Sequence, residues 1–319
     1  MICAEAFVKA LKLDAYFTVP GRFTIPLNIS LKRINARRVT VPDERCAGHA
    51  ADGYARITGK PAGLVVSAGP GALNAILPVA TAFRDNVPMV VIAGDVPTYS
   101  RGSLAIEEVD LIEVFRPICK DVIYVSSKEE MVKAIELAKN SVKAPKRPVF
   151  IDLPLDLQEE EVELNGQEVR VDSNVNLGDL ERASSEVAEL LERSSKPLIV
   201  VGNGCIESHG AIAKFAEAYE IPMAYTLMGW CMAWPKPSVS IGFCGIRGFK
   251  TANRALQECG FLLALGARLS DATTAYGISD EAIIAQVLVE GPFHKNTELK
   301  IRSRCEEFVK SLCEKYRGC

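Results

Sequence analysis

The sequence predicts an α/β protein of two doubly wound domains, each built on a mostly parallel sheet. The chain has 319 residues, which is more than a single hydrophobic core usually organises. In both halves, short apolar runs alternate with segments of helical periodicity, as in a parallel sheet covered by helices on both faces. A polar stretch at residues 157–179 interrupts this alternation, so it divides the chain.

The elements of the first domain, residues 1–156, follow from local periodicity. Apolar and β-branched runs predict strands, and apolar residues at helical spacing predict helices. The predicted strands are 15–19, 38–41, 63–67, 89–93 and 148–153, and the predicted helices are 25–31, 44–57, 72–83 and 129–139.

The stretch 157–179 is predicted to be a linker because it contains the acidic run Glu159-Glu160-Glu161 and an Asn165-Gly166 turn. Alternation resumes in the second domain, residues 180–319. Its predicted strands are 198–201, 223–226, 261–265 and 283–289, and its predicted helices are 180–192, 211–218, 252–258 and 302–316.

Composition limits the classes of partner. Hydrophobic residues make up 48% and charged residues 24% of the chain, and the net charge is -3, as in an ordinary globular protein. The absence of a basic block argues against binding nucleic acid or an anionic membrane surface. The N-terminus has no basic leader before an apolar core, and no apolar run is long enough to cross a bilayer. We therefore expect a cytoplasmic location.

Ten cysteines are scattered singly along the chain, without a Cys-x-x-Cys pair. Zinc or iron–sulfur ligation therefore has no support, and the site prediction includes no metal ligand. We expect most of these cysteines to be small buried hydrophobes. Disulfides would be expected only if the protein came from a hyperthermophile.

The most informative segment, residues 43–60, leads from a β-like run into a helix with Glu44 in its first turn. A purely structural explanation exists, since an acid there favours the helix dipole and Asp43 can act as N-cap. A second segment, residues 67–74, contains Gly69-Pro70-Gly71 between a buried strand and a helix. Such glycines allow a ligand close to the backbone, although an ordinary tight turn explains them equally well.

Other motifs accompany these two segments in order. In the first half they are Thr18-Val19-Pro20-Gly21 and residues 82–88, 94–98 and 150–156; in the second half they are residues 196–202, 226–229, 242–248 and 266–271. Together they resemble the pyrimidine-binding domain and the Rossmann-like middle domain of acetolactate synthases and related thiamine-diphosphate decarboxylases. The resemblance covers nearly the whole chain.

The resemblance implies a thiamine-diphosphate-dependent decarboxylase or carboligase, a transferase or lyase acting on a small 2-oxo acid. In that family, a glutamate matching Glu44 hydrogen-bonds N1′ of the aminopyrimidine and so promotes removal of the thiazolium C2 proton. The residues implied on the pyrimidine side are Gly21, Gly69, Pro70, Gly71, Asn74 and Glu107. His49 lies in the same helix, where we expect a partly buried structural histidine.

The middle domain of acetolactate synthases holds FAD as a structural cofactor, so the resemblance makes FAD a candidate here. The residues that retain a nucleotide-binding outline are Gly202, Gly204, Thr226, Gly245, Arg247, Gly266 and Arg268. An acid at a strand end commonly holds a nucleotide ribose. Here that strand reads Val287-Leu288-Val289, which weakens the case for FAD.

The diphosphate and its metal need a Gly-Asp-Gly motif, and the sequence contains none. We therefore expect a separate diphosphate-domain subunit that carries magnesium, with this chain a homodimer within a hetero-oligomer. Three departures qualify the activity: the bulky pair Arg22-Phe23, Glu107 where the family has glutamine, and the missing strand-end acid. An extra carboxylate at Glu107 would require a partner such as Arg22 or Arg101. The alternative is a non-catalytic regulatory or nucleotide-binding subunit.

Overall fold

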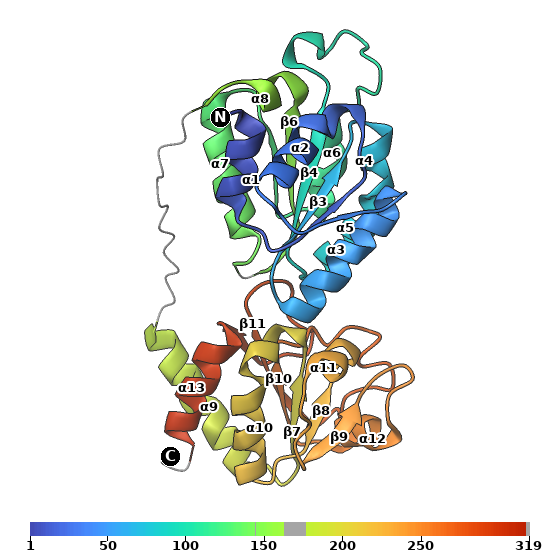
Figure 1. Cartoon of the computed structure of the whole chain (residues 1–319). Helices are drawn as coiled ribbons and strands as arrows, with labels where there is room; N and C mark the ends of the chain where they lie inside the picture. Colours follow the sequence, from blue (N-terminus) through green and yellow to red (C-terminus); the bar gives the residue numbers. More distant parts are fainter. Residues whose placement is uncertain (144, 163–176, 317–319) are drawn as a thin grey trace. The chain divides into compact units, whose positions relative to one another are not determined.

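A computed structural model describes residues 1–143, 145–162 and 177–316 (Figure 1). The chain divides into two compact units, Met1–Val171 and Asp172–Cys319. Most of the predicted linker, including the expected turn at Asn165-Gly166, lies outside the described residues.

The first unit is built on a six-stranded sheet of order β2-β1-β3-β4-β6-β5, in which all neighbours pair in parallel. Its strands are β1 (Tyr16–Thr18), β2 (Arg38–Thr40), β3 (Ala62–Val66), β4 (Met89–Asp95), β5 (Asp121–Tyr124) and β6 (Val149–Pro154). The strand order reverses at β1: β2 lies on one side of β1, and β3 and the later strands lie on the other. The loops that follow β1 and β3 therefore lead away from each other. Such a switch point is where open α/β sheets bind ligands.

Helices cover both faces of this sheet (Figure 1). One face packs against α1 (Cys3–Leu11), α2 (Ile25–Arg33), α7 (Lys128–Asn140) and α8 (Leu155–Glu159). The other packs against α3 (Glu44–Thr58), α4 (Pro70–Asn74), α5 (Ile76–Arg84) and α6 (Leu111–Phe115). Short 3₁₀ segments follow the strands at η1 (Arg22–Thr24) and η2 (Thr98–Ser100), and η3 (Arg116–Ile118) follows α6.

The single helix predicted at 72–83 is wrong, because α4 and α5 are separate helices that meet at Ala75. Pro78 explains the break. It lacks the N–H that would bond to the carbonyl of Asn74, and its ring would clash with that carbonyl. The break leaves Asn74 at the end of a short helix that starts at the Gly-Pro-Gly turn.

The second unit also has a six-stranded parallel sheet, of order β12-β11-β10-β7-β8-β9. Its strands are β7 (Pro197–Val201), β8 (Met223–Tyr225), β9 (Ser240–Phe243), β10 (Phe261–Leu265), β11 (Ile283–Leu288) and β12 (Leu299–Arg302). The order reverses between β7 and β10, as in dinucleotide-binding folds. The two parallel sheets confirm the predicted doubly wound α/β class.

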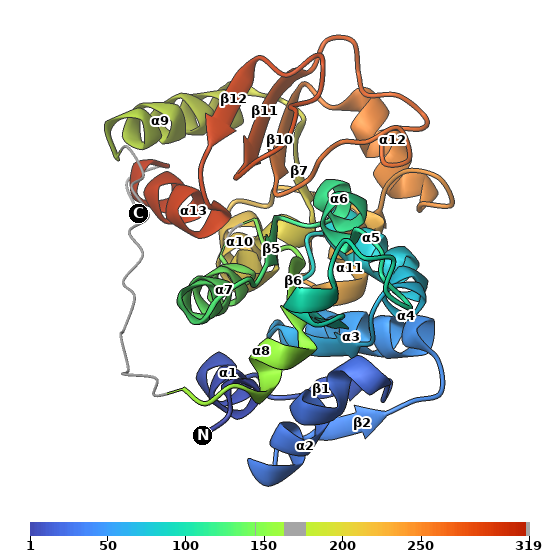
Figure 2. The same cartoon turned by 90° about the horizontal axis from the view of Figure 1, so that it is seen from above.

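The helices of the second unit also lie in two layers. One face packs against α9 (Leu177–Arg193), α10 (His209–Ala218) and α13 (Cys305–Lys315), and the other against α12 (Lys250–Glu258). Helices α9 and α13 lie side by side (Figure 2). Short segments follow two strands: η4 (Asn203–Ser208) after β7 and α11 (Leu227–Met232) after β8. The terminal helix begins at Cys305, not at residue 302 as predicted, because β12 occupies the residues up to Arg302.

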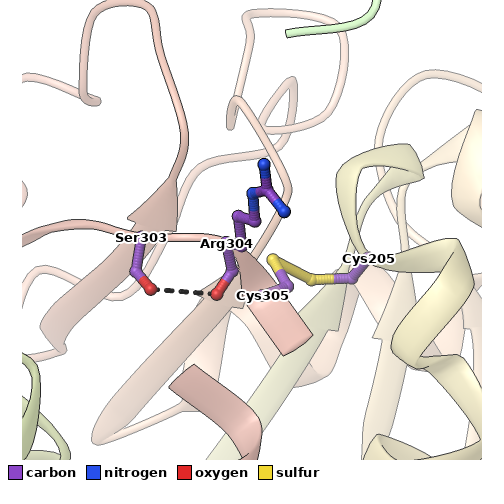
Figure 3. Close-up of a disulfide and its surroundings, with 4 residues drawn as sticks. All are labelled: Cys205, Ser303, Arg304 and Cys305. Atoms are coloured by element: carbon purple, nitrogen blue, oxygen red, sulfur yellow. Dashed lines mark hydrogen bonds between the residues drawn. A yellow bond between two sulfur atoms is a disulfide. The ribbon is translucent and has the colours of Figure 1, made fainter. Parts of the chain in front are cut away.

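Cys205 and Cys305 form a disulfide between η4 and the first residue of α13, with their Cα atoms 5.5 Å apart (Figure 3). Both cysteines are buried, and the sequence left open whether any of the cysteines form disulfides. Among the other described cysteines, Cys3, Cys119, Cys244 and Cys259 are buried, as expected. Within the part of the chain that the structure describes, no helix is long and apolar enough to cross a membrane.

Candidate functional site at the carboxyl edge of the first sheet

Glu44 begins helix α3 and points its carboxylate toward helix α4. Asp43 is the N-cap, and its side chain accepts a hydrogen bond from the Arg45 backbone N–H at 2.8 Å. Hydrogen bonds from Arg45 lower the pKa of the Asp43 carboxyl to about 2. Asp43 therefore fulfils the capping role, and Glu44 is free for another contact: its Oε2 accepts a hydrogen bond from Asn74 Nδ2 at 3.0 Å.

The Gly-Pro-Gly turn makes room beside this carboxylate. A Cβ added to Gly71 would lie 3.2 Å from Glu44 Oε1. Gly69 adopts φ +46°, and a Cβ there would lie 2.0 Å from the carbonyl oxygen of Glu107. Pro70 occupies the first helical position, where its missing N–H costs nothing. The two glycines are therefore favoured because neighbouring atoms leave little or no room for a side chain on their Cα atoms.

A buried hydroxyl completes the site. Ser67 follows β3, and its Oγ is buried without a hydrogen-bond partner among the described residues. A Cβ on Gly21, which follows β1, would lie 2.5 Å from this Oγ. Because buried polar atoms are almost always paired, the unpaired hydroxyl offers a contact to a bound polar ring. Sequence reasoning treated Ser67 only as part of a motif, since nothing in the sequence shows its isolation.

The residues that depart from the family pattern are accommodated by the fold. Phe23 is buried in a small cluster with Ala68 and Val96, so its bulk does not enter the site. The Arg22 guanidinium lies 5.4 Å from the centre of the Phe23 ring. The Glu107 side chain is exposed and its backbone has φ +69°.

Two charged neighbours of the site lie in other surroundings than the sequence suggested. Arg101, one of the two candidate partners named for the extra carboxylate, pairs with Asp95 and Asp152. The predicted partly buried His49 is exposed, because it lies on the solvent face of α3.

Comparison with known proteins agrees with this geometry. Residues 1–114 match the family model described as thiamine pyrophosphate enzyme, N-terminal TPP binding domain, and residues 184–312 match thiamine pyrophosphate enzyme, central domain. The chain belongs to the thiamine pyrophosphate enzyme family.

Relatives of this family are similar over 85% of the chain. The probable acetolactate synthase large subunit of Methanocaldococcus jannaschii is 33% identical, and the alignment covers 48% of that protein. The acetolactate synthase large subunit of Parasynechococcus marenigrum is also 33% identical, with 46% covered. The chloroplastic acetolactate synthase of Arabidopsis thaliana is 32% identical, with 42% covered. The chain thus spans about half the length of the curated relatives it matches, or less.

In the second unit, which contains the match to the central-domain model, the predicted nucleotide outline lies at the carboxyl ends of β7 to β10. Gly202 and Gly204 after β7 pack directly on Gly266 after β10, where a Cβ on Gly202 would lie 2.2 Å from the Gly266 carbonyl oxygen. Thr226 caps α11 by accepting a hydrogen bond from Gly229 N. Gly245 packs against the Ala272 carbonyl. Of the two arginines, Arg247 is exposed and Arg268 is half-buried.

This outline fits FAD only in part. The three glycines are required for packing between the two turns, so their presence does not by itself indicate a phosphate. The strand-end positions Val287 to Val289 supply no acid for a ribose. Buried Gln286, which sequence reasoning did not select, donates a hydrogen bond to Ala267 O and accepts bonds from His294 N and Thr297 Oγ1. Both polar atoms of its amide are therefore hydrogen-bonded within the protein.

Proposed function

We propose that this chain supplies the cofactor-activating side of a thiamine-diphosphate-dependent 2-oxo acid decarboxylase or carboligase resembling acetolactate synthase. The observation that carries the proposal is the hydrogen bond between Glu44 and Asn74 beside Gly71. Helix capping cannot explain this arrangement, because Asp43 already caps the helix. The names of the relatives agree with this class of activity.

The residues present fit the aminopyrimidine of the cofactor. Gly21 and Gly71 let the backbone approach Ser67 and Glu44 more closely than a side chain would allow, and Ser67 Oγ is buried without a partner among the described residues. Gly69 and the Glu107 carbonyl shape the opposite side of the turn. The chemistry that thiamine diphosphate supplies when bound is a thiazolium carbon that adds to a 2-oxo acid carbonyl and accepts the electron pair left by decarboxylation.

Within this proposal, Glu44 holds and moves one proton at N1′ of the pyrimidine. Asn74 orients the carboxylate by donating to Oε2, which leaves Oε1 directed toward Gly71. Such a positioned proton-transfer group typically contributes about 10²–10⁴ in rate. Pro70 fixes the start of α4, so it fixes where Asn74 lies.

The diphosphate and magnesium belong, in this proposal, to a diphosphate-binding domain outside these 319 residues, on a partner subunit or on a continuation of the chain. No cluster of three or more potential metal ligands occurs among the described residues. The sequence also has no Gly-Asp-Gly motif. A homodimer of this chain within a larger assembly would present two pyrimidine-side sites, one around each Glu44.

The test is the exchange of the cofactor C2 proton in deuterium oxide, followed by proton NMR in the complete enzyme. Glu44→Gln should slow exchange by about 10²–10⁴. Its effect on stability should be small, because a first-turn carboxylate is worth about 0.3–1 kcal/mol to its helix. Glu129→Gln is the matched control, since Glu129 is an exposed first-turn acid of α7. Equal exchange rates in wild type and Glu44→Gln would favour a non-catalytic regulatory subunit instead.

FAD enters the proposal only as a structural cofactor of the central domain, and no step of the reaction passes through it. The glycines at the β7–β10 switch point support it, whereas the missing strand-end acid opposes it. The flavin absorbance of freshly purified protein tests this part independently of Glu44. If the purified protein is colourless and takes up no added FAD, then FAD is not a cofactor of the central domain.

A further inference from the structure

Two fully buried aspartates lie next to each other at the carboxyl edge of the first sheet. Asp95 ends β4, and Asp152 lies in the adjacent strand β6, opposite Ala93. Neither oxygen of Asp152, nor Oδ1 of Asp95, has a hydrogen-bond partner among the described residues. Burying two carboxylates without pairing them is strongly unfavourable, so the structure must supply a compensating charge or a proton.

Arg101 supplies that charge from a loop. Its Nη1 lies 2.6 Å from Asp95 Oδ2 and 3.6 Å from Asp152 Oδ2. Its guanidinium also lies 4.0 Å from the centre of the Tyr124 ring, a favourable cation–π distance. One cation faces two acids here, so the group is neutral when the acids share one proton.

The titration behaviour of the two acids agrees with a shared proton. Burial is the main cause that raises the pKa of Asp152, followed by the charge of Asp95. Burial also raises the pKa of Asp95, while Arg101 opposes that shift. The other charged groups that face this pair are Glu108 toward Asp95 and Asp110 toward Asp152.

The loop of residues 98–110, which contains Arg101, is held mainly by polar contacts. Three of its large apolar side chains point to solvent: Tyr99 is 82%, Leu104 97% and Ile106 77% exposed. Figure 1 shows this loop in teal, projecting away from the sheet. Ala105 packs against the cluster formed by Phe23, Ala68 and Val96, and Val109, near the end of the loop, packs against the core on the α3 side of the sheet. Hydrophobic burial therefore contributes little to the position of residues 99–106.

Three polar anchors fix the loop instead. Thr98 donates from its N–H and its hydroxyl to Asp156. The Glu108 carboxylate accepts from the backbone N–H groups of Gly102 and Ala105, which closes the loop on itself. Arg101 is the anchor that reaches the sheet through Asp95 and Asp152.

The loop in turn contacts the Gly-Pro-Gly turn. The Glu107 carbonyl oxygen lies so close to Gly69 that a Cβ there would be 2.0 Å away. The same turn places Gly71 and, through α4, Asn74 beside Glu44. A continuous series of contacts therefore runs from the buried acids through the loop to the Glu44 carboxylate.

We propose that Arg101 is a positioning residue, whose ion pairs with the buried Asp95 and Asp152 hold the 98–110 loop against Gly69 and thereby support the geometry around Glu44. The link to Glu44 rests on the proposed function, but the anchoring of the loop does not.

Hydrogen–deuterium exchange of the purified chain tests the proposal without any activity assay. In Arg101→Gln, amides of residues 99–108 should exchange about tenfold to a hundredfold faster, as expected for loss of a charged hydrogen bond that limits local opening. Amides of residues 69–74 should also exchange faster, because the loop no longer supports the Gly-Pro-Gly turn. Arg101→Lys keeps the charge and should recover part of the protection.

Arg116→Gln is the matched control, since Arg116 forms a surface ion pair with Glu113 just beyond this loop. It should leave exchange at residues 99–108 and 69–74 unchanged. If the loop amides of Arg101→Gln exchange at the wild-type rate, Arg101 does not anchor the loop. A loosened loop with unchanged exchange at 69–74 would overturn its link to the site.

If Arg101→Gln does not fold, a second variant takes its place. The double variant Asp95→Asn/Asp152→Asn removes both carboxylate charges while keeping side-chain shape, so it must loosen the same peptides. Wild-type protection in that variant would refute the ion-pair anchor. A failure of Glu44→Gln to slow cofactor exchange would count against the proposed function but leave these results intact.

Discussion

At the scale of single residues, the buried carboxyl of Asp152 links the stability of the first unit to pH. Its pKa is raised well above 3.8, mainly by burial and then by the charge of Asp95. A raised pKa means that the folded chain holds the proton more tightly than the unfolded chain. The contribution to stability is therefore fully present below about pH 3.8 and is lost as pH rises through the folded-state pKa.

Asp152→Asn removes this dependence because an amide cannot ionise, while the pair between Arg101 and Asp95 remains. We expect the free energy of unfolding of the variant, relative to wild type, to rise between pH 5 and pH 8, by about 1.4 kcal/mol for each pH unit over which only the folded wild type holds the proton. Urea unfolding at the two pH values measures it. Asp121→Asn, on the neighbouring strand β5, controls for loss of one negative charge. A constant difference at both pH values would contradict a shared proton.

The residue-level chemistry was predictable where it depended on short motifs. Glu44, Gly71 and Asn74 were selected from sequence, and the structure brings them together. Their roles toward the cofactor remain predictions. Asp95, Asp152 and Arg101 could not be grouped from sequence as an ion-paired cluster, because their contact depends on the register of two strands separated by more than fifty residues. The exposure of His49 was missed because one helical position decides which face a side chain occupies.

At the scale of elements, most apolar strands and uninterrupted helices were predicted, whereas three edge strands and one break in a helix were missed. Strand β10 and the start of α3 agree with the predicted residues. The edge strands β5, β9 and β12 were missed because they have only four residues each, with polar residues among them. Pro78 was visible in the sequence, but its effect on the helix at 72–83 was overlooked.

The disulfide gives an element-scale prediction, because it joins η4 to α13 across 100 residues of sequence. Both cysteines are buried. Cys205→Ala/Cys305→Ala should therefore destabilise the second unit by about 2–5 kcal/mol, which lowers its Tm by roughly 10 °C. Thermal unfolding followed by tryptophan fluorescence reports this unit alone, since both tryptophans, Trp230 and Trp234, lie in it.

Exposed Cys231 provides the control for this experiment, and Cys231→Ala should leave the Tm of the second unit unchanged. Dithiothreitol should lower the Tm of wild type but not that of the double variant. If reductant has no effect on wild type and both thiols react freely after unfolding without it, the bond does not form in the protein.

At the scale of the whole molecule, the two parallel sheets place their candidate binding residues at carboxyl edges next to a switch in strand order. In the first unit these residues include a buried hydroxyl, Ser67 Oγ, that has no hydrogen-bond partner among the described residues, and no cluster of potential metal ligands occurs in the described part of either unit. Phosphates are usually held by metal ions, helix N-termini or cationic side chains. In the proposed function, this chain supplies pyrimidine contacts, and another domain supplies the magnesium that holds the diphosphate.

This asymmetry predicts that the isolated chain binds thiamine and thiamine diphosphate about equally and weakly, with Kd values of about 1 mM or more, since a few ring contacts barely exceed the cost of association. Calorimetry or saturation-transfer NMR with each ligand, with and without magnesium, measures the difference. Glu44→Ala should weaken both ligands alike, because both carry the same pyrimidine, and Glu129→Ala should weaken neither. Adding the diphosphate-binding domain should tighten only thiamine diphosphate, and only with magnesium. Tight magnesium-dependent binding of thiamine diphosphate to the chain alone would show that these 319 residues hold the diphosphate themselves, and the shared site would have to be abandoned.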